Sequence, residues 1–315
     1  MLFLALVVGV TGILESFYYI PTPEQAGTSI QALTFLVPFG GLVRNLHFWS
    51  AQLLVVVCAL HLLRVILTGA YGPPRIFNYL LGLGLLVLAL LLDFTGYVLR
   101  WDEGIHWAMI TGTNLVRSIP WAGDALYAFL VGGSQPGTAT LLRFFGWHVF
   151  GLTLAGAILV TWHVFRVRRD GGISAPPQQL RRERLRITRY ELAHREVQVM
   201  LLAGSGLLML SIFFPAPLEA PLAGADAVVS GTSCAPWFFL WVQQMLRLGD
   251  PFLWGVLVPS GVLLLLALLP YILPLARPKE LGSWFPRGNR FAQVLILAIA
   301  LTIAALTVLP LFNSC

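Results

Sequence analysis

Long stretches without a charged side chain recur along this chain. They cover residues 45–63, 76–92, 144–165, 197–218, 251–276 and 291–315. Most of them reach the roughly 20 residues that a membrane-spanning helix needs. The first twenty residues form another apolar stretch, interrupted only by Glu15, without the basic start and small-residue cleavage site of a signal peptide. The pattern predicts an all-α integral membrane protein with seven transmembrane helices.

A polar segment divides these helices into two groups. Residues 166–196 contain many arginines and the pair Pro176-Pro177. We therefore predict an N-terminal four-helix domain over residues 1–172 and a cytoplasmic basic linker over residues 173–196. A three-helix C-terminal domain over residues 197–315 follows.

Composition and charge are typical of a protein whose solvent is the bilayer. Hydrophobic residues make up 57% of the chain and charged residues 11%, and the mean hydropathy is +0.80, which is too apolar for a soluble domain. With a cytoplasmic N-terminus, fifteen of the twenty Lys and Arg residues fall on the inner side, as the positive-inside rule requires. We predict a multi-pass protein of the bacterial inner membrane with its C-terminus outside. The net charge of +6 needs no nucleic-acid partner, because basic residues face anionic lipid.

Four histidines lie inside two of the predicted helices. His47 and His61 are fourteen residues apart, and His148 and His163 are fifteen apart. At ~3.6 residues per turn these intervals are close to four turns, so each pair lies on one helix face with about 21 Å between its members. Both helices run from outside to inside. His47 and His148 are thus predicted to bind the iron of an outer haem b, and His61 and His163 that of an inner haem b.

The alternative is that the histidines are polar side chains satisfied by hydrogen bonds in the bundle. Two pairs at matched depth favour ligands, because buried ionisable residues are costly in a membrane. Two glycines, Gly82 and Gly96, have the same fourteen-residue spacing and would let a flat porphyrin approach the backbone. Three arginines are candidate partners of haem propionates, although snorkelling anchors would have the same positions: Arg44, Arg64 and Arg143.

Short segments around these histidines resemble the cytochrome b family of quinol:electron-acceptor complexes, in its chloroplast-type form. They are Gly41-Leu-Val-Arg-Asn-Leu-His47, His61-Leu-Leu-Arg64, Gly96-Tyr-Val-Leu-Arg-Trp-Asp102, Arg143-Phe-Phe-Gly-Trp-His148 and Gly172-Ile-Ser-Ala-Pro176. The similarity is strong over residues 10–177. The remaining helices look like the small subunit that the family carries as a separate chain, here fused.

The resemblance implies an electron-transfer function. Its members oxidise quinol at an outer site, passing one electron to a Rieske iron–sulfur protein and the other through two non-covalent b haems to an inner quinone site. It also implies a homodimeric complex in the membrane lipid, with a Rieske protein, multihaem cytochrome c subunits or both as partners. Nothing in the first helix matches the cysteine that anchors the family's extra haem, so we expect no haem c in this chain.

The outer quinol site departs from the family pattern. Its motif is Pro-Glu-Trp-Tyr, whose Glu accepts a proton, whereas this chain has Ala235 followed by Pro236, Trp237 and Phe238. Asp93 lies within the third long helix, four residues before Tyr97. An intramembrane acid is a candidate functional group, and we predict that Asp93, with Tyr97 nearby, replaces the missing carboxylate. The alternative is a protonated Asp bonded to the backbone or paired with an arginine.

Two other functions compete with quinol oxidation. A dihaem membrane anchor that passes electrons from an outer redox enzyme to quinone would keep the haems and explain the lost carboxylate. A transporter would show inverted repeats and broken helices, which the sequence lacks. Cysteines add little: three are too few for a disulfide framework, although Cys234 and Cys315 would both face the oxidising side, where they could pair.

Overall fold

The computed structural model of the chain describes residues 1–172, 188–222, 234–277, 280 and 283–312. Among these residues the regular structure is helical, apart from one isolated antiparallel bridge between Asp102 and Pro221. The helices, in chain order, are α1 (Leu2–Ser16), α2 (Ala26–Phe35), α3 (Gly40–Leu67), α4 (Ile76–Leu99), α5 (Glu103–Arg117), α6 (Gly123–Val131), α7 (Thr138–Phe145), η1 (Gly146–Gly151), α8 (Leu152–Asp170), α9 (Arg189–Phe213), η3 (Trp237–Phe239), α10 (Leu240–Leu246), η4 (Phe252–Leu257), α11 (Val258–Ile272), η5 (Arg287–Asn289) and α12 (Arg290–Phe312).

Six helical stretches in the described part of the chain are long and apolar enough to cross a membrane. They are α3, α4, the continuous stretch from α7 through η1 to α8, α9, the stretch from η4 to α11, and η5 with α12. The predicted first span is shorter. Helix α1 has 15 residues, fewer than the roughly 20 that cross the hydrocarbon core. The expected count of seven spans is therefore not confirmed: the described residues contain six candidate spans and α1 as a shorter apolar helix.

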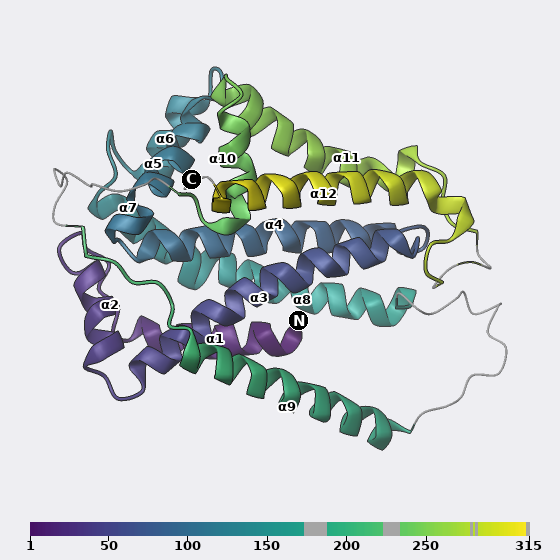
Figure 1. Cartoon of the computed structure of the whole chain (residues 1–315), viewed down its shortest axis with the longest axis horizontal. Helices are drawn as coiled ribbons and strands as arrows, with labels where there is room; N and C mark the ends of the chain where they lie inside the picture. Colours follow the sequence, from purple (N-terminus) through teal and green to yellow (C-terminus); the bar gives the residue numbers. More distant parts are fainter. Residues whose placement is uncertain (173–187, 223–233, 278–279, 281–282, 313–315) are drawn as a thin grey trace.

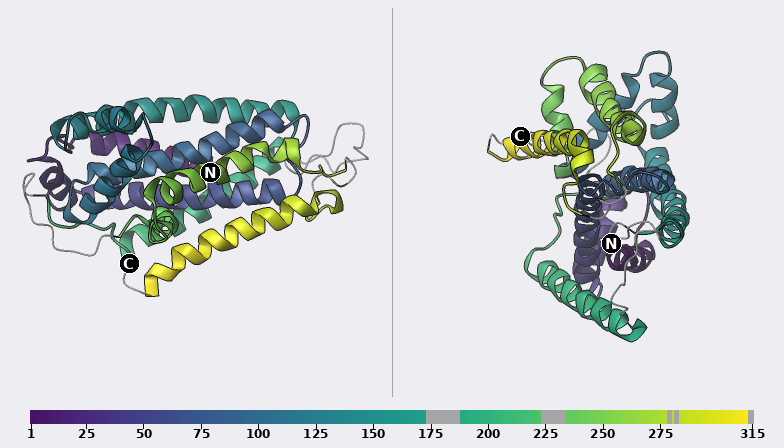
Figure 2. Two further views of the ribbon diagram at one scale, coloured as in Figure 1. Left: turned by 90° about the horizontal axis from the view of Figure 1, so that it is seen from above. Right: turned by 90° about the vertical axis from the view of Figure 1, so that its right-hand side faces the viewer.

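The long helices lie side by side, and the short ones gather at one end (Figure 1). Helices α1, α3, α4 and α8 group together, while α11 and α12 lie along the opposite side of α3 and α4 (Figure 2). Helices α2, α5, α6 and α7 lie at the end to which α1 and α4 run, which the charge pattern assigns to the outside (Figure 1). Helix α9 lies at the edge and packs on α3.

Two buried hydrophobic clusters lie near the two ends of the bundle, and we name them inner and outer after the sides that the charge pattern predicts. The inner cluster joins the two halves of the chain through α3, α4, α11 and α12: Ile66, Leu67, Tyr71, Tyr79, Leu83, Leu266, Leu269, Ala292 and Ile296. The outer cluster fixes the short helices against the end of α4: Ala26, Val98, Leu99, Trp101, Met109, Leu141, Phe144 and Leu222. Both clusters leave out the four histidines.

Polar side chains of α3 fasten the end of α9. The guanidinium of Arg44 donates to the carbonyls of Ala216 (3.1 Å) and Pro217. The amide of Asn45 donates to the carbonyl of Ser211 and accepts from the backbone N–H of Ala216, both at 2.9 Å. The first turns of α9 include residues 189–196, the last part of the predicted linker, whereas residues 173–187 lie outside the described residues.

A second set of bonds is centred on Asp102, which is fully buried at the end of the molecule that holds the short helices. Its carboxylate is paired with Arg100 at 2.6 Å and accepts from the backbone N–H groups of Ile105 and Glu219. These bonds cap the start of α5 and tie it to the segment that follows α9. Cys234 is disulfide-bonded. Its possible partner Cys315 lies outside the described residues, so the pairing of these two cysteines stays an expectation.

Candidate functional site

The four histidine rings face one another in two pairs inside the bundle. His47 and His61 come from α3, His148 from η1 and His163 from α8. The ring centroids of His47 and His148 are 6.3 Å apart, and those of His61 and His163 are 6.5 Å apart. The pairs in space are thus those that the sequence spacing predicts.

This separation fits two imidazoles on opposite sides of one metal ion. An imidazole nitrogen lies about 2 Å from a metal, and the ring centroid lies about 1 Å further out, so two axial ligands place their centroids about 6 Å apart. Groups of three or more His, Cys, Asp or Glu that could hold a bare metal are absent from the described residues. Two facing histidines suit haem, because the porphyrin supplies the other four ligands.

A π-helical turn explains how histidine intervals of fourteen and fifteen residues give two pairs with nearly equal ring separations. Residues Gly146–Gly151 form a π-helix around His148, in which the backbone N–H of Leu152 donates to the carbonyl of Trp147. Such a turn takes up one residue more than an α-helical turn. The fifteen residues from His148 to His163 therefore cover the same span as the fourteen from His47 to His61. The hydroxyl of Thr153 donates to the His148 carbonyl next to this irregularity.

Three glycines make room for the imidazoles. A Cβ on Gly96 would lie 2.8 Å from Cε1 of His148, and one on Gly82 would lie 3.2 Å from Cε1 of His163. Gly12 of α1, which the sequence pattern did not single out, has the same relation to His47 at 2.9 Å. The structure shows the histidine ring itself against each glycine, while the predicted role of Gly82 and Gly96, approach of the porphyrin to the backbone, stays a prediction.

The two outer histidines have matching hydrogen-bond partners. Nδ1 of His47 lies 3.1 Å from the carbonyl of Val8 and 3.0 Å from Oγ1 of Thr11. His148 interacts with the carbonyl of Leu92, and its Nδ1 lies 3.0 Å from Oγ1 of Thr95. Acceptors at Nδ1 fix the proton there and leave the lone pair on Nε2, the usual arrangement of a metal-binding imidazole.

The inner pair has less support of this kind. Nδ1 of His163 is buried without a hydrogen bond of normal geometry, although the Asn78 carbonyl interacts with it. Leu81 stands before Gly82, where Thr11 and Thr95 precede their glycines. The dipeptide Thr-Gly at positions 11–12 and 95–96 is the sequence signal from which these contacts of His47 and His148 could have been predicted.

The three predicted propionate partners have protein partners in this structure. Arg44 binds the two carbonyls after α9, and Arg143 donates to the carbonyls of Ala128 (2.8 Å) and Phe129. The exposed Arg64 lies over the ring of Trp284 at 5.8 Å. These contacts account for Arg44 and Arg143 as structural residues, and their predicted role toward haem stays a prediction.

Asp93 is joined to the altered outer motif through Gln52, a residue that the sequence reasoning missed. Nε2 of Gln52 donates to Oδ1 of Asp93 at 2.9 Å, and the indole Nε1 of Trp237 donates to Oε1 of Gln52 at 2.6 Å. Oδ2 of Asp93 is buried without a partner. The expected partners of a purely structural Asp, a backbone group or an arginine, are not bonded to it.

Aromatic rings surround this polar chain. Tyr97 packs on Phe238 with centroids 5.7 Å apart and on Phe48 at 6.3 Å, and the guanidinium of Arg100 lies 5.4 Å from the Tyr97 centroid. Pro236 precedes the η3 turn that presents Trp237 and Phe238. The structure therefore brings all the predicted outer-site residues together between α3, α4 and η3.

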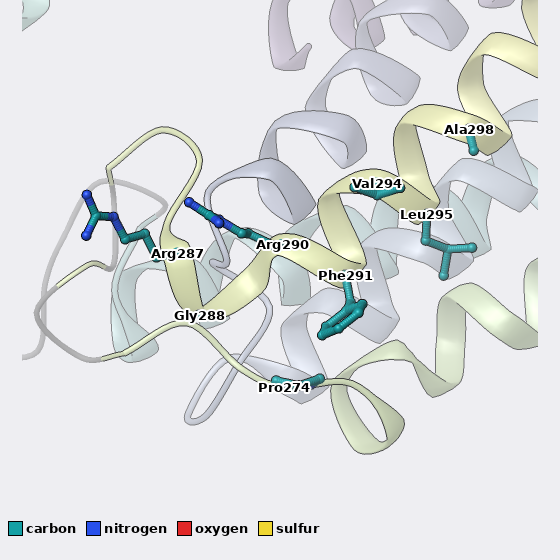
Figure 3. Close-up of a pocket in the computed structure, with 8 residues that line it drawn as sticks. All are labelled: Pro274, Arg287, Gly288, Arg290, Phe291, Val294, Leu295 and Ala298. Carbon is teal, nitrogen blue, oxygen red and sulfur yellow. The ribbon is translucent and has the colours of Figure 1, made fainter.

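A cavity is formed by other residues than the histidines and the outer-site residues. It measures about 660 Å³ and lies at the start of α12 (Figure 3), where it is lined by Pro274, Arg287, Gly288, Arg290, Phe291, Val294, Leu295 and Ala298. The side chain of Arg287 extends away from the apolar lining (Figure 3). No histidine or acid lines the cavity, so it is no candidate for the chemistry.

Known proteins match this chain in sequence and in fold. Residues 52–221 match the family model described as cytochrome b(N-terminal)/b6/petB. Cytochrome b6 of Heliomicrobium gestii is 41% identical over 166 residues, which are 53% of this chain and 78% of that protein. Cytochrome b6 of a Synechococcus strain is 40% identical, over 53% of this chain and 77% of the relative. A chain of a hyperthermophilic respiratory Complex III has a similar fold, with a TM-score of 0.82 over 98% of this chain and 81% of its own, at 23% identity.

Proposed function

This chain belongs to the cytochrome b(N-terminal)/b6/petB family, and from this premise we propose that it is the dihaem cytochrome b subunit of a membrane quinol oxidoreductase complex. Family membership makes it a haem-binding membrane protein of electron transport. The finer proposal is that electrons cross the bilayer between an outer quinol site and an inner quinone site. The observation that carries it is the pair of facing histidine rings at each of two depths.

Two b haems would be held by the histidine pairs, His47 with His148 outside and His61 with His163 inside. Bound haem iron supplies one-electron oxidation and reduction. The protein fixes the imidazole tautomer at the outer pair through Thr11 and Thr95 and encloses the site in apolar helices. About 21 Å along the helices separates the two levels.

Quinol would be oxidised at the outer site formed by Asp93, Tyr97, Pro236, Trp237 and Phe238. Asp93 would accept the proton that leaves a quinol hydroxyl, and the packed rings of Tyr97 and Phe238 would offer a flat aromatic substrate an apolar surface. The buried, unpartnered Oδ2 of Asp93 supports this assignment.

The complex would be an assembly in the bacterial inner membrane, with a cytoplasmic N-terminus. We propose a Rieske protein, multihaem cytochrome c subunits or both as redox partners, and a homodimer as the assembled form. The fusion divides into the four-helix domain 1–172, the linker 173–196 and the C-terminal domain 197–315.

A second function reverses the quinone chemistry. In it the chain is a dihaem membrane anchor that takes electrons from an outer redox enzyme and reduces quinone. The specific observation in its favour is the outer motif itself, because residues 235–238 contain no carboxylate.

Quinol-driven haem reduction separates the two functions. Purified complex is mixed with excess quinol, and haem absorbance is followed with and without an inhibitor of the outer site. Quinol oxidation predicts inhibitor-sensitive haem reduction that slows by about 100-fold or more in Asp93→Asn, the contribution typical of a general base. Haems that quinol does not reduce, but that reoxidise when quinone is added to the reduced protein, would identify the anchor instead.

A further inference from the structure

Gln52 connects a surface residue with a buried acid across three elements. It lies on α3, Asp93 on α4 and Trp237 on η3. Trp237 is 38% exposed and Asp93 only 7%, so this polar chain runs from the edge of the protein to its interior. The two bonds have lengths of 2.6 and 2.9 Å.

The chemistry of the indole determines which way the Gln52 amide points. An indole N–H donates and has no acceptor, so the Gln52 atom that faces Trp237 must be the oxygen. The amide nitrogen then faces Asp93, where its N–H requires an acceptor. Oδ1 of Asp93 is that acceptor. A carboxylic acid accepts more strongly through its carbonyl oxygen than through its hydroxyl oxygen, so this bond favours the acidic proton on Oδ2.

The other carboxyl oxygen is left to receive a proton. Oδ2 is buried and has no hydrogen-bond partner. A buried polar atom without a partner costs free energy, and such atoms in native proteins often mark a functional role or a missing ligand. The rings of Tyr97 and Phe238, 5.7 Å apart at their centroids, lie beside this group.

We propose that Gln52, oriented by Trp237, is a positioning residue that makes Oδ2 of Asp93 the single proton-accepting atom of the outer site. The inference rests on the proposed quinol oxidation and adds the atom at which a hydroxyl proton arrives. A quinol O–H bond breaks and the Oδ2–H bond forms, directly or through one water. The proton of the second hydroxyl would pass to outer water. The two electrons would be taken up by the haem that His47 and His148 would hold and by a one-electron acceptor of a partner subunit.

The arrangement predicts a spectroscopic signature of Asp93. Once Oδ2 is protonated, Oδ1 is a carbonyl oxygen that accepts from Gln52, and a hydrogen bond lowers the C=O stretching frequency. Infrared difference spectra of the intact complex, recorded between the oxidised and the quinol-reduced state, should contain this band. Its assignment is made by its loss in Asp93→Asn.

Two variants test the position of Gln52. In Gln52→Leu the band should move to higher frequency, and the turnover number for quinol oxidation should fall on the order of tenfold with little change in KM, because the base is misplaced. In Trp237→Phe the amide is free to rotate, so the band should broaden and turnover should fall less. The double variant should be no slower than Gln52→Leu, because Trp237 acts through Gln52.

Trp241→Phe is the matched control. Its indole donates to the Phe238 carbonyl at 2.9 Å and is no part of the chain to Asp93, so the band should stay in place. Intact haem spectra show that each variant is folded. An unmoved band in folded Gln52→Leu, or an equal shift in Trp241→Phe, would overturn the inference. Absent quinol-driven haem reduction in the wild type would overturn the proposed function itself.

Discussion

At the scale of single residues, one backbone device recurs at three of the four histidines. Each of these rings lies against a glycine and interacts with the backbone carbonyl of the residue four positions before that glycine. His47 lies against Gly12 and interacts with Val8, His148 with Gly96 and Leu92, and His163 with Gly82 and Asn78. The missing Cβ is what lets the ring reach a carbonyl within a helix. The device makes these glycines specific requirements of the site.

Gly96→Ala tests this requirement. The new Cβ would lie 2.8 Å from Cε1 of His148, and overpacking of this kind typically costs about 1–3 kcal/mol. We expect the outer haem to be lost or its spectrum changed while the inner haem remains, measured as haem per chain. Gly84→Ala on the same helix is the control, since nothing lies within 4 Å of its Cβ, and it should retain both haems. Equal haem loss in both variants would contradict the prediction.

Thr95→Val tests the hydrogen bond at Nδ1 of His148. A bond at the far nitrogen raises the basicity of the ligand, so its removal should raise the midpoint potential of the outer haem. A bond worth about 1 kcal/mol corresponds to up to about 40 mV for one electron. A redox titration should show the outer haem shifted and the inner haem unchanged. A common shift of both haems, or a fall in the outer potential, would exclude this role.

The sequence identifies some of these residues and not others for a physical reason. Four histidines and Asp93 are conspicuous because ionisable groups are rare within membrane helices. Gln52 has no such signature, because it is an uncharged amide. Its role depends on the hydrogen bond from Trp237, 185 positions away in the sequence. The partners of the three arginines could not be predicted either, because they lie on segments that only tertiary packing brings close.

At the scale of elements, α9 is fastened to α3 mainly at its outer end. Asn45 bonds Ser211 and Ala216, and Trp49 bonds the Phe214 carbonyl at 2.6 Å. Few residues of α9 are buried, namely Leu207 and Ser211. Hydropathy predicts α9 as a span, but it cannot predict this contact, because the bonding groups are backbone atoms that any sequence would have.

Asn45→Ala should loosen α9. The change leaves one carbonyl and one N–H without their partner, a cost of about 1–3 kcal/mol each when buried. We expect a lower thermal unfolding temperature and faster proteolysis near residues 211–217. The exposed Asn114 of α5 offers a control, and Asn114→Ala should leave both measurements unchanged. Unaltered proteolysis of Asn45→Ala would show that these bonds do not hold α9.

The π-helical turn at His148 is a second helical feature that shapes the site. From sequence, the fifteen-residue interval predicts that His148 and His163 lie on one face of a helix, and they do. In a regular α-helix, however, fifteen residues would turn the second histidine further around the axis than the fourteen residues between the histidines of α3. The extra residue is taken up in Gly146–Gly151. Hydrophobic periodicity has no means of revealing a single extra residue.

At the scale of the whole molecule, the two halves of the chain are joined by packing as well as by the linker. The inner cluster combines Ile66 and Tyr79 of the first half with Leu269 and Ile296 of the second. At the outer side, the backbone N–H of Leu222 donates to the Trp101 carbonyl at 3.1 Å beside the buried Asp102. Hydropathy could predict the six long apolar helices of the two halves, whereas the contacts between the halves could not be predicted from it.

A split chain tests the interface. Residues 1–180 and 181–315, expressed together as separate polypeptides, should assemble because the contacts between the halves do not need a covalent connection. The pair should copurify through a tag on one half, with the haem content of the intact protein. Ile66→Asp, which places a charge in a fully buried position, should abolish copurification. Halves that never associate would show that the fusion is required for assembly.

The proposed function requires that four histidines hold two haems, and haem stoichiometry measures this. Protein and non-covalent b-type haem are quantified in the purified wild type, in His47→Leu and in His163→Leu. We predict two low-spin haems per chain in the wild type, loss of the outer haem alone in His47→Leu and loss of the inner haem alone in His163→Leu. A wild type with fewer than two haems, or single variants that keep both, would contradict it.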